Sequence, residues 1–153
     1  ATDAEARDVF PYVVGNLDWY GWQAFKQGKR ADALRMYDRA AELAPTDRDL
    51  LQRRAYIIVG SDHPDVPALQ DAVRKNPDDL RLRQQLDYSL ARERRFDEVV
   101  ATWSEYIARH PDDATAYRER GGAHCQLREI PAARADATKA CELGDNEGCA
   151  HMR

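Results

Sequence analysis

Apolar side chains recur along this chain at intervals of three and four residues. This spacing places them on one face of an α-helix. Ala33, Tyr37 and Ala40 show it clearly, and the charged residues Arg35, Asp38 and Arg39 lie among the positions between them. The same pattern predicts helices near residues 14–27, 30–43, 48–59, 65–75, 80–93, 96–109, 114–127 and 130–143, and a short helix after 146.

Three prolines, Pro45, Pro77 and Pro111, separate these helices at nearly equal intervals. Each stands in a similar turn, written APTDRD, NPDDLR and HPDDAT. Proline cannot continue a helix, and Asp or Thr caps the next one by accepting backbone N–H groups. A period near 34 residues is typical of a solenoid of helical hairpins. We interpret the acidic pairs in two of these turns, Asp78-Asp79 and Asp112-Asp113, as helix caps.

The repeated unit resembles the tetratricopeptide repeat (TPR) over most of the chain. Gly21, Ala55 and Gly121 stand where that repeat has a small residue and packed helices approach closely. Asp87 replaces the small residue in the third unit and Tyr106 replaces the usual alanine, so we expect different packing there. The resemblance implies an all-α, right-handed superhelical solenoid of about four hairpins. Its repeat domain would be 14–153, with repeats near 14–45, 46–77, 78–111 and 112–145 and a C-terminal helical stub.

Residues 1–13 form a separate N-terminal segment in this interpretation. We expect a short helix at Asp3–Val9 that breaks before Pro11 and covers the open end of the solenoid, because solenoids need terminal caps. An alternative is that the segment fills the groove of the solenoid, which would then be a structural spacer. The chain begins at Ala1 without Met, which fits both a mature protein after removal of a leader and a piece of a longer chain.

The resemblance also implies a binding surface, because the first helix of each TPR lines a concave groove that usually contacts an extended peptide. Trp22, Tyr56 and Tyr88 occupy equivalent places and should align along this groove. Aromatic side chains bury a large area and keep a polar handle, which suits recognition. In the alternative interpretation they fill gaps between neighbouring helices. The predicted groove residues are Trp22, Phe25, Lys26, Gln52, Tyr56, Arg81, Gln84, Tyr88, Arg92 and Arg118.

Basic residues of this set suggest an acidic ligand, since a concave surface focuses electrostatic potential. The alternative is ordinary solvated surface charge. One TPR subtype binds the C-terminal carboxylate of chaperones through a Lys/Asn pair, but this chain has Asp18 and Trp22 at those places. The chaperone-tail function is therefore not expected. The basic residues concerned are Lys26, Arg81, Arg92 and Arg118.

The stretch KACELGDNEGCAHM contains Cys141 and Cys149 and resembles the cysteine-containing Sel-type helical repeats. In that family the two cysteines are bridged, which implies a disulfide and an oxidising compartment such as a bacterial periplasm. Free thiols in a reducing cytoplasm are the alternative. A metal site with His124 and His151 is not expected, because the tight ligand pairs of zinc sites are missing. We expect Cys125, within a helix, to be an inert buried thiol.

Composition narrows the classes of function. The chain has 23 Lys and Arg against 27 Asp and Glu, a net charge of −4, without the positive excess of a general nucleic-acid binder. Its longest apolar run, Ala55–Val59, is far shorter than the ~20 residues of a transmembrane helix. It has no glycine-rich phosphate loop, and no histidine is spaced for pairing with a nucleophile. We therefore expect neither catalysis nor a cofactor.

The sequence thus predicts a non-catalytic scaffold that binds a protein or peptide along a concave groove. A second hypothesis is a periplasmic TPR module of a bacterial envelope or surface-polysaccharide export system. Such a module would bind a glycan or assembly partners, because aromatic side chains also stack on sugar rings. Both hypotheses allow the chain to be part of a larger complex. The sequence alone leaves the choice open, since a fold does not determine a function.

Overall fold

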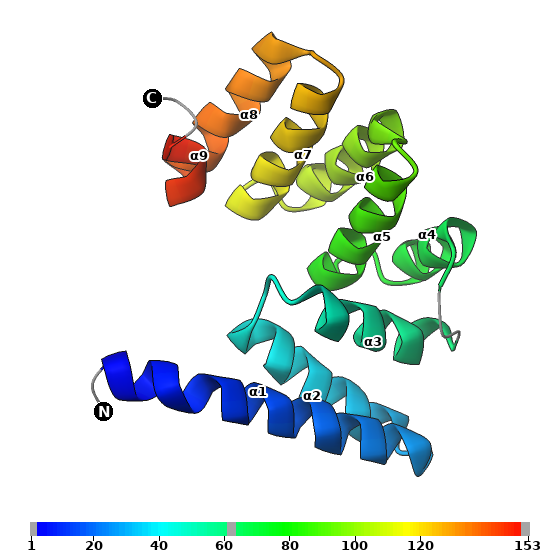
Figure 1. The fold of residues 1–153 in the computed structure, drawn as a ribbon. Helices are drawn as coiled ribbons and strands as arrows, with labels where there is room; N and C mark the ends of the chain where they lie inside the picture. Colours follow the sequence, from blue (N-terminus) through cyan, green and yellow to red (C-terminus); the bar gives the residue numbers. More distant parts are fainter. Residues whose placement is uncertain (1–2, 61–63, 151–153) are drawn as a thin grey trace. The chain divides into compact units, whose positions relative to one another are not determined.

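The computed structural model of the protein describes residues 3–60 and 64–150, and these residues form helices, turns and no strand (Figure 1). From Arg30 onward the helices match the predicted ranges to within one residue at each end, which confirms the all-α class. The helices are α1 (Asp3–Lys26), α2 (Arg30–Leu43), α3 (Arg48–Val59), α4 (Val66–Lys75), α5 (Leu80–Arg92), α6 (Phe96–Arg109), α7 (Ala114–Gln126), α8 (Ile130–Glu142) and α9 (Asn146–Ala150).

The prediction for the N-terminal segment is wrong in one respect. The helix does not break before Pro11, because α1 runs without interruption from Asp3 to Lys26 (Figure 1). Proline removes only one backbone donor, and the turns on either side keep their own hydrogen bonds, so a helix can continue through it. The role of residues 1–13 as a terminal cap stays a prediction.

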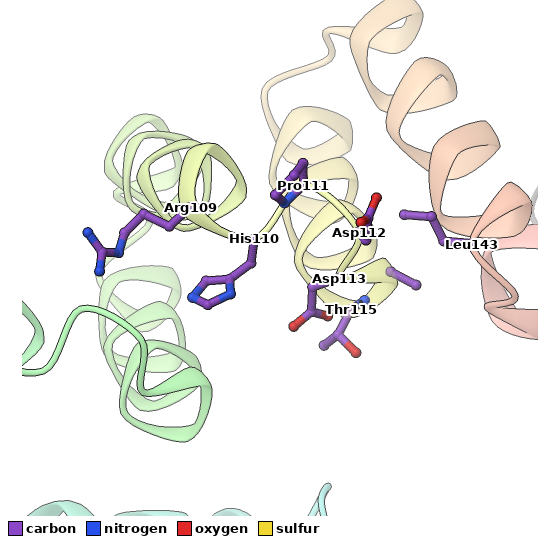
Figure 2. A pocket seen from close by; sticks show the side chains of 8 residues that line it. Arg109, His110, Pro111, Asp112, Asp113, Thr115 and Leu143 are labelled. Atoms are coloured by element: carbon purple, nitrogen blue, oxygen red, sulfur yellow. Dashed lines mark hydrogen bonds between the residues drawn. The ribbon is translucent and has the colours of Figure 1, made fainter.

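Aspartates begin the first helices of the later hairpins. Asp47 accepts hydrogen bonds from two backbone N–H groups of α3, at 3.0 and 3.2 Å. Asp79 accepts one from Leu82 at 2.9 Å, and Asp113 accepts one at the start of α7 at 3.0 Å (Figure 2). The predicted caps are therefore confirmed for the second member of each acidic pair. Asp78 was also predicted to cap, which is wrong, because its carboxylate binds side chains of α6 and the turn after it.

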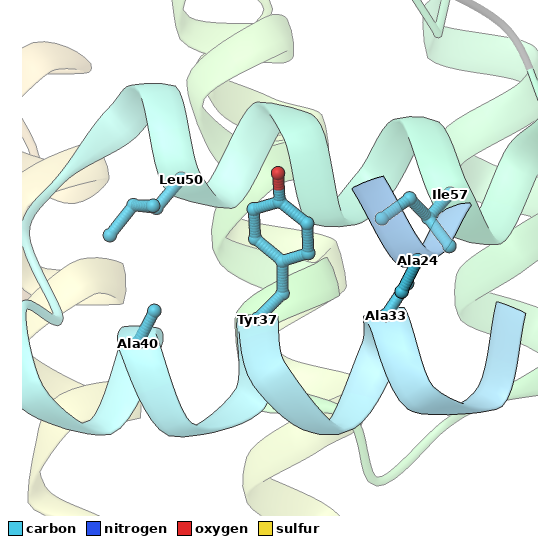
Figure 3. Packing of buried hydrophobic residues seen from close by; sticks show 6 residues of the cluster. All are labelled: Ala24, Ala33, Tyr37, Ala40, Leu50 and Ile57. Carbon is cyan, nitrogen blue, oxygen red and sulfur yellow. The ribbon is translucent and has the colours of Figure 1, made fainter. Parts of the chain in front are cut away.

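The chain divides into two compact units, Ala1–Ala72 and Val73–Arg153. In unit 1, α1 and α2 form an antiparallel hairpin and α3 packs on α2. Tyr37 of α2 is fully buried and lies between Leu50 and Ile57 of α3 (Figure 3). The cluster at the centre of this unit consists of Ala24, Ala33, Tyr37, Ala40, Leu50 and Ile57.

Gly21 lets α1 approach Tyr37 closely. A Cβ atom at Gly21 would lie 2.9 Å from Cε2 of the Tyr37 ring, so the predicted need for a small residue is confirmed. The Tyr37 hydroxyl donates to Asp18 Oδ1 at 2.8 Å, and Arg53 pairs with the same carboxylate. Burial and the neighbouring carboxylate both raise the pKa of Tyr37 above its usual value.

Unit 2 repeats the arrangement with different side chains. Trp103 of α6 is fully buried, and its Nε1 donates to Asp87 Oδ2 of α5 at 2.6 Å. Asp87 therefore stands at a small-residue position because it accepts the indole hydrogen bond, which confirms the expected difference in packing. Gly121 again permits a close approach, since a Cβ there would lie 3.2 Å from Cβ of Asp136. Across the described residues, no helix has both the length and the apolarity needed to cross a lipid bilayer.

Candidate functional site

Three aromatic rings meet on unit 1. Trp22 and Phe25 of α1 have ring centroids 5.5 Å apart, and Tyr56 of α3 lies 5.5 Å from Trp22 and 5.3 Å from Phe25. All three side chains are half-buried. Phe25 and Tyr56 also pack against the central cluster of the unit. We call Trp22, Phe25 and Tyr56 the aromatic cluster.

The aromatic cluster contains Trp22 and Tyr56, two residues that the repeat register placed at equivalent positions. Trp22 and Tyr56 do touch, and Phe25 completes the contact between α1 and α3. The rings thus pack between neighbouring first helices, as the gap-filling interpretation held, while part of their surface stays exposed. Tyr88, the third aromatic residue of the predicted row, lies in unit 2 on α5 and is half-buried.

The other predicted groove residues differ in how much surface they offer. Lys26 and Arg92 end their helices and are exposed. Arg81 is half-buried and donates to Gln84 Oε1 at 3.1 Å, and Gln84 itself is only 4% exposed. Gln52 of α3 is half-buried. Of this set, Lys26 and Arg92 are the cations most open to a ligand.

Arg118 is engaged with the C-terminal part of the chain. Its guanidinium lies 3.3 Å from carboxylate oxygens of Asp145 and of Glu147, on either side of the start of α9, and 3.3 Å from Glu119. Burial by itself would lower the pKa of Arg118, but the acidic neighbours outweigh it and the pKa is raised. Burial raises the pKa of Glu119. Arg118 therefore ties the stub to α7 through two ion pairs, with Asp145 and Glu147.

The same stub is joined to α8 by a disulfide. Cys141 and Cys149 are bonded, with Cα atoms 4.8 Å apart, so the structure has the pairing that the Sel-type resemblance implied. His151, named above for a metal site, lies outside the described residues. Cys125 is exposed, not buried as predicted, because it stands in the last turn of α7, on the side that faces solvent.

A pocket of about 590 Å³ opens where α6 ends and α7 begins (Figure 2). His110 stacks on Tyr106 with ring centroids 4.4 Å apart, and the Tyr106 hydroxyl donates to Asp113 Oδ2 at 3.0 Å. Burial, then the Asp113 carboxylate, raises the pKa of Tyr106. The pocket is lined by Arg109, His110, Pro111, Asp112, Asp113, Ala114, Thr115 and Leu143.

Asp78 ties this pocket to the preceding turn. Arg109 donates to both of its oxygens, at 2.9 and 3.0 Å, and His110 Nε2 lies 2.8 Å from Oδ1. Hydrogen bonds from Arg109 and then from His110 lower the pKa of Asp78 to about 2. Sequence reasoning missed this contact, although Asp78 and His110 stand in consecutive proline turns. Among the side chains that the structure describes, no three His, Cys, Asp or Glu residues are placed to hold a metal ion.

Known proteins share this architecture. No protein-family model matches the chain, and no curated protein matches its sequence significantly. YrrB, described as a TPR protein with an unusual peptide-binding site, is 23% identical over 86% of this chain and 70% of its own, with a TM-score of 0.55. TTC0263, a TPR protein of Thermus thermophilus, is 20% identical over 86% and 75%, with a TM-score of 0.52. The chain has the TPR fold. MamA of AMB-1 also matches, at 21% identity over 85% and 78% and a TM-score of 0.51.

The TPR fold assigns each helix a place. In chain order, α1, α3, α5 and α7 take the places of first helices and α2, α4, α6 and α8 those of second helices. The pairs α1–α2, α5–α6 and α7–α8 pack as hairpins. The aromatic cluster therefore comes from the first helices of two successive hairpins, where the sequence placed it. The Sel-type character of the last repeat remains a resemblance carried by its cysteine stretch.

Proposed function

We propose that this protein is a non-catalytic scaffold that binds a protein or peptide on the side formed by its first helices. The observation that carries the proposal is the aromatic cluster, in which rings from two successive first helices meet within 5.5 Å and stay partly exposed. Because these rings already pack on one another, their side chains lose little conformational freedom when a ligand binds. Aromatic side chains of this kind dominate binding at protein interfaces.

Peptide is the ligand class that the fold relatives favour, because YrrB is described as having a peptide-binding site. Lys26 favours acidic ligands in unit 1, since it is an exposed cation that follows Phe25 at the end of α1. Unit 2 has cations of its own on α5, the exposed Arg92 and the half-buried Arg81. Arg118 contributes less to such steering, because three carboxylates already surround it.

The glycan hypothesis has weaker support. A periplasmic or envelope setting rests on the Cys141–Cys149 disulfide, because disulfides persist in oxidising compartments. The compared structures add nothing for a polysaccharide ligand. The two hypotheses share one aromatic surface, so a single set of variants tests both.

The decisive experiment selects peptides from a random display library on the whole protein and then measures the affinity of a selected synthetic peptide by calorimetry. Trp22→Ala and Tyr56→Ala should each weaken binding about tenfold or more, since each removes an aromatic anchor. Ile130→Ala is the control. It removes an exposed large apolar side chain of α8, outside both the aromatic cluster and the first helices, and should change affinity less than about twofold.

Unchanged affinity in both cluster variants would place the binding site elsewhere and contradict the proposal. The same calorimetry with an acidic oligosaccharide separates the alternatives. Saturable heat that disappears in Trp22→Ala would favour the glycan hypothesis over a peptide.

A further inference from the structure

One side of α1 exposes large apolar side chains. Tyr12 is 76% exposed, Val13 39%, Trp19 62% and Tyr20 59%, and Asn16 between them is exposed as well. Intervals of three, four, seven and eight residues place all five on one side of the helix. We call these five residues the outer face of α1. It carries no charge, although charged residues make up 33% of the chain.

Residues at the same repeat positions in later first helices show how part of this face is packed there. Asn16 and Tyr20 correspond to Leu50 and Arg54 of α3, which are only 4% and 8% exposed. Leu50 belongs to the central cluster with residues of α2, and Arg54 Nε donates to Asp38 of α2 at 2.6 Å. This side of α3 therefore packs on the second helix of the preceding hairpin.

Unit 2 follows the same rule. Ala116 and Arg120 of α7 stand at the corresponding positions, and Ala116 is fully buried. Arg120 Nη1 donates to Ser104 of α6, the preceding second helix, at 3.2 Å. Asn16 and Tyr20, at the centre and one end of the outer face, thus stand at helix-packing positions, and in this structure both are exposed.

The pattern of this face is symmetric about Asn16. Tyr12 and Tyr20 lie four residues to either side of it, and Val13 and Trp19 lie three residues to either side. If two copies cross antiparallel at Asn16, Tyr12 of each meets Tyr20 of the other, and Val13 meets Trp19. The two Asn16 amides can then bond to one another, because each both donates and accepts.

We propose that the outer face of α1 is a homodimer contact in which two α1 helices cross antiparallel about Asn16. A two-fold interface requires a self-complementary patch, which the symmetric spacing provides. Each chain carries a net charge of −4, so an uncharged patch also lets two copies meet without like charges at the contact. A second copy therefore fits this face better than an unrelated partner.

The test is the mass of the whole protein in solution, measured by light scattering over a range of concentrations. The wild type should approach twice the chain mass of 17.4 kDa as concentration rises. Tyr20→Glu should weaken the dimer about tenfold or more, because it buries a charge without a partner. Ile130→Glu is the matched control, since Ile130 is 50% exposed and belongs to α8, not to the outer face of α1.

A double variant tests the antiparallel arrangement. Tyr12→Lys combined with Tyr20→Glu sets a lysine of each copy opposite a glutamate of the other and should restore the dimer that Tyr20→Glu loses. Circular dichroism checks that every variant keeps its helices. A wild type that stays monomeric, or a dimer that tolerates Tyr20→Glu, overturns the proposal. Loss without restoration overturns the crossing at Asn16.

Discussion

At the scale of single residues, Gly21 and Gly121 set how closely a first helix approaches the second helix of its hairpin. Tyr37, opposite Gly21, is fully buried, and its ring lies 2.9 Å from where a Cβ of residue 21 would stand. Asp136, opposite Gly121, is 4% exposed and is fixed by Arg120, which donates to both of its oxygens at 2.8 and 2.6 Å. Both contacts favour glycine for packing rather than for backbone conformation.

Gly21→Ala tests this packing requirement. Alanine is the better helix former by about 1 kcal/mol. The new Cβ nevertheless lies 2.9 Å from the Tyr37 ring, and overpacking a core typically costs about 1–3 kcal/mol. We expect a net loss in the free energy of unfolding, measured by urea denaturation. Gly15→Ala on the same helix meets nothing within 4 Å and should gain about 0.5–1 kcal/mol. Equal gains in both variants would contradict the close contact.

At the scale of elements, the helices from α2 to α9 followed from the sequence because two local signals agreed. Apolar spacing marked the buried faces, and each proline turn ended with an aspartate that caps the next helix, as Asp79 and Asp113 do. Pro11 misled the prediction because a proline weakens a helix without always ending it. The exposure of Cys125 was missed because apolar spacing does not show which side of a short last turn faces solvent.

The candidate site was predictable where the repeat register determines it. Register placed Trp22 and Tyr56 on neighbouring helices, and their rings meet. It did not reveal the ion pairs of Asp78 with Arg109 and His110, because these depend on how two separate turns come together. Composition did not indicate the outer face of α1 either. The exposure of this face is unusual only by comparison with α3 and α7, where the residues equivalent to Asn16 are buried.

The C-terminal stub leads to a prediction about a whole element. Alkylation of the unfolded protein without reductant should label one cysteine, Cys125, while reduction should expose three, as read from intact mass. Hydrogen exchange should then be faster in α9 after reduction, because the bridge contributes roughly 2–3 kcal/mol by restricting the unfolded chain. Cys125→Ser is the control and should take no label without reductant.

Labelling of all three cysteines in protein prepared from its native compartment would contradict the bridge there. It would also remove the support for an oxidising compartment. The ion pairs of Arg118 with Asp145 and Glu147 would then be the remaining side-chain ties to the stub among those described here.

At the scale of the whole molecule, each of the two units has its own buried residues. Tyr37 and Ile57 are fully buried in unit 1, and Trp103 and Ala140 are fully buried in unit 2. In repeat proteins each repeat contacts mainly its neighbours, so stability is nearly a sum of local terms. A packing defect in one hairpin should therefore destabilise mainly that hairpin.

Paired glycine variants test this locality. Gly21→Ala should speed amide hydrogen exchange in α1 and α2 and leave α7 and α8 nearly unchanged, because its clash is confined to Tyr37 of the first hairpin. Gly121→Ala should do the reverse, since its Cβ meets Asp136 of α8. Hydrogen exchange of the whole protein, resolved by mass spectrometry, measures the rates in α1 and α2 and in α7 and α8 in one experiment. Equal acceleration of all four helices by either variant would mean that the units unfold together, and that stability here is global rather than a sum over repeats.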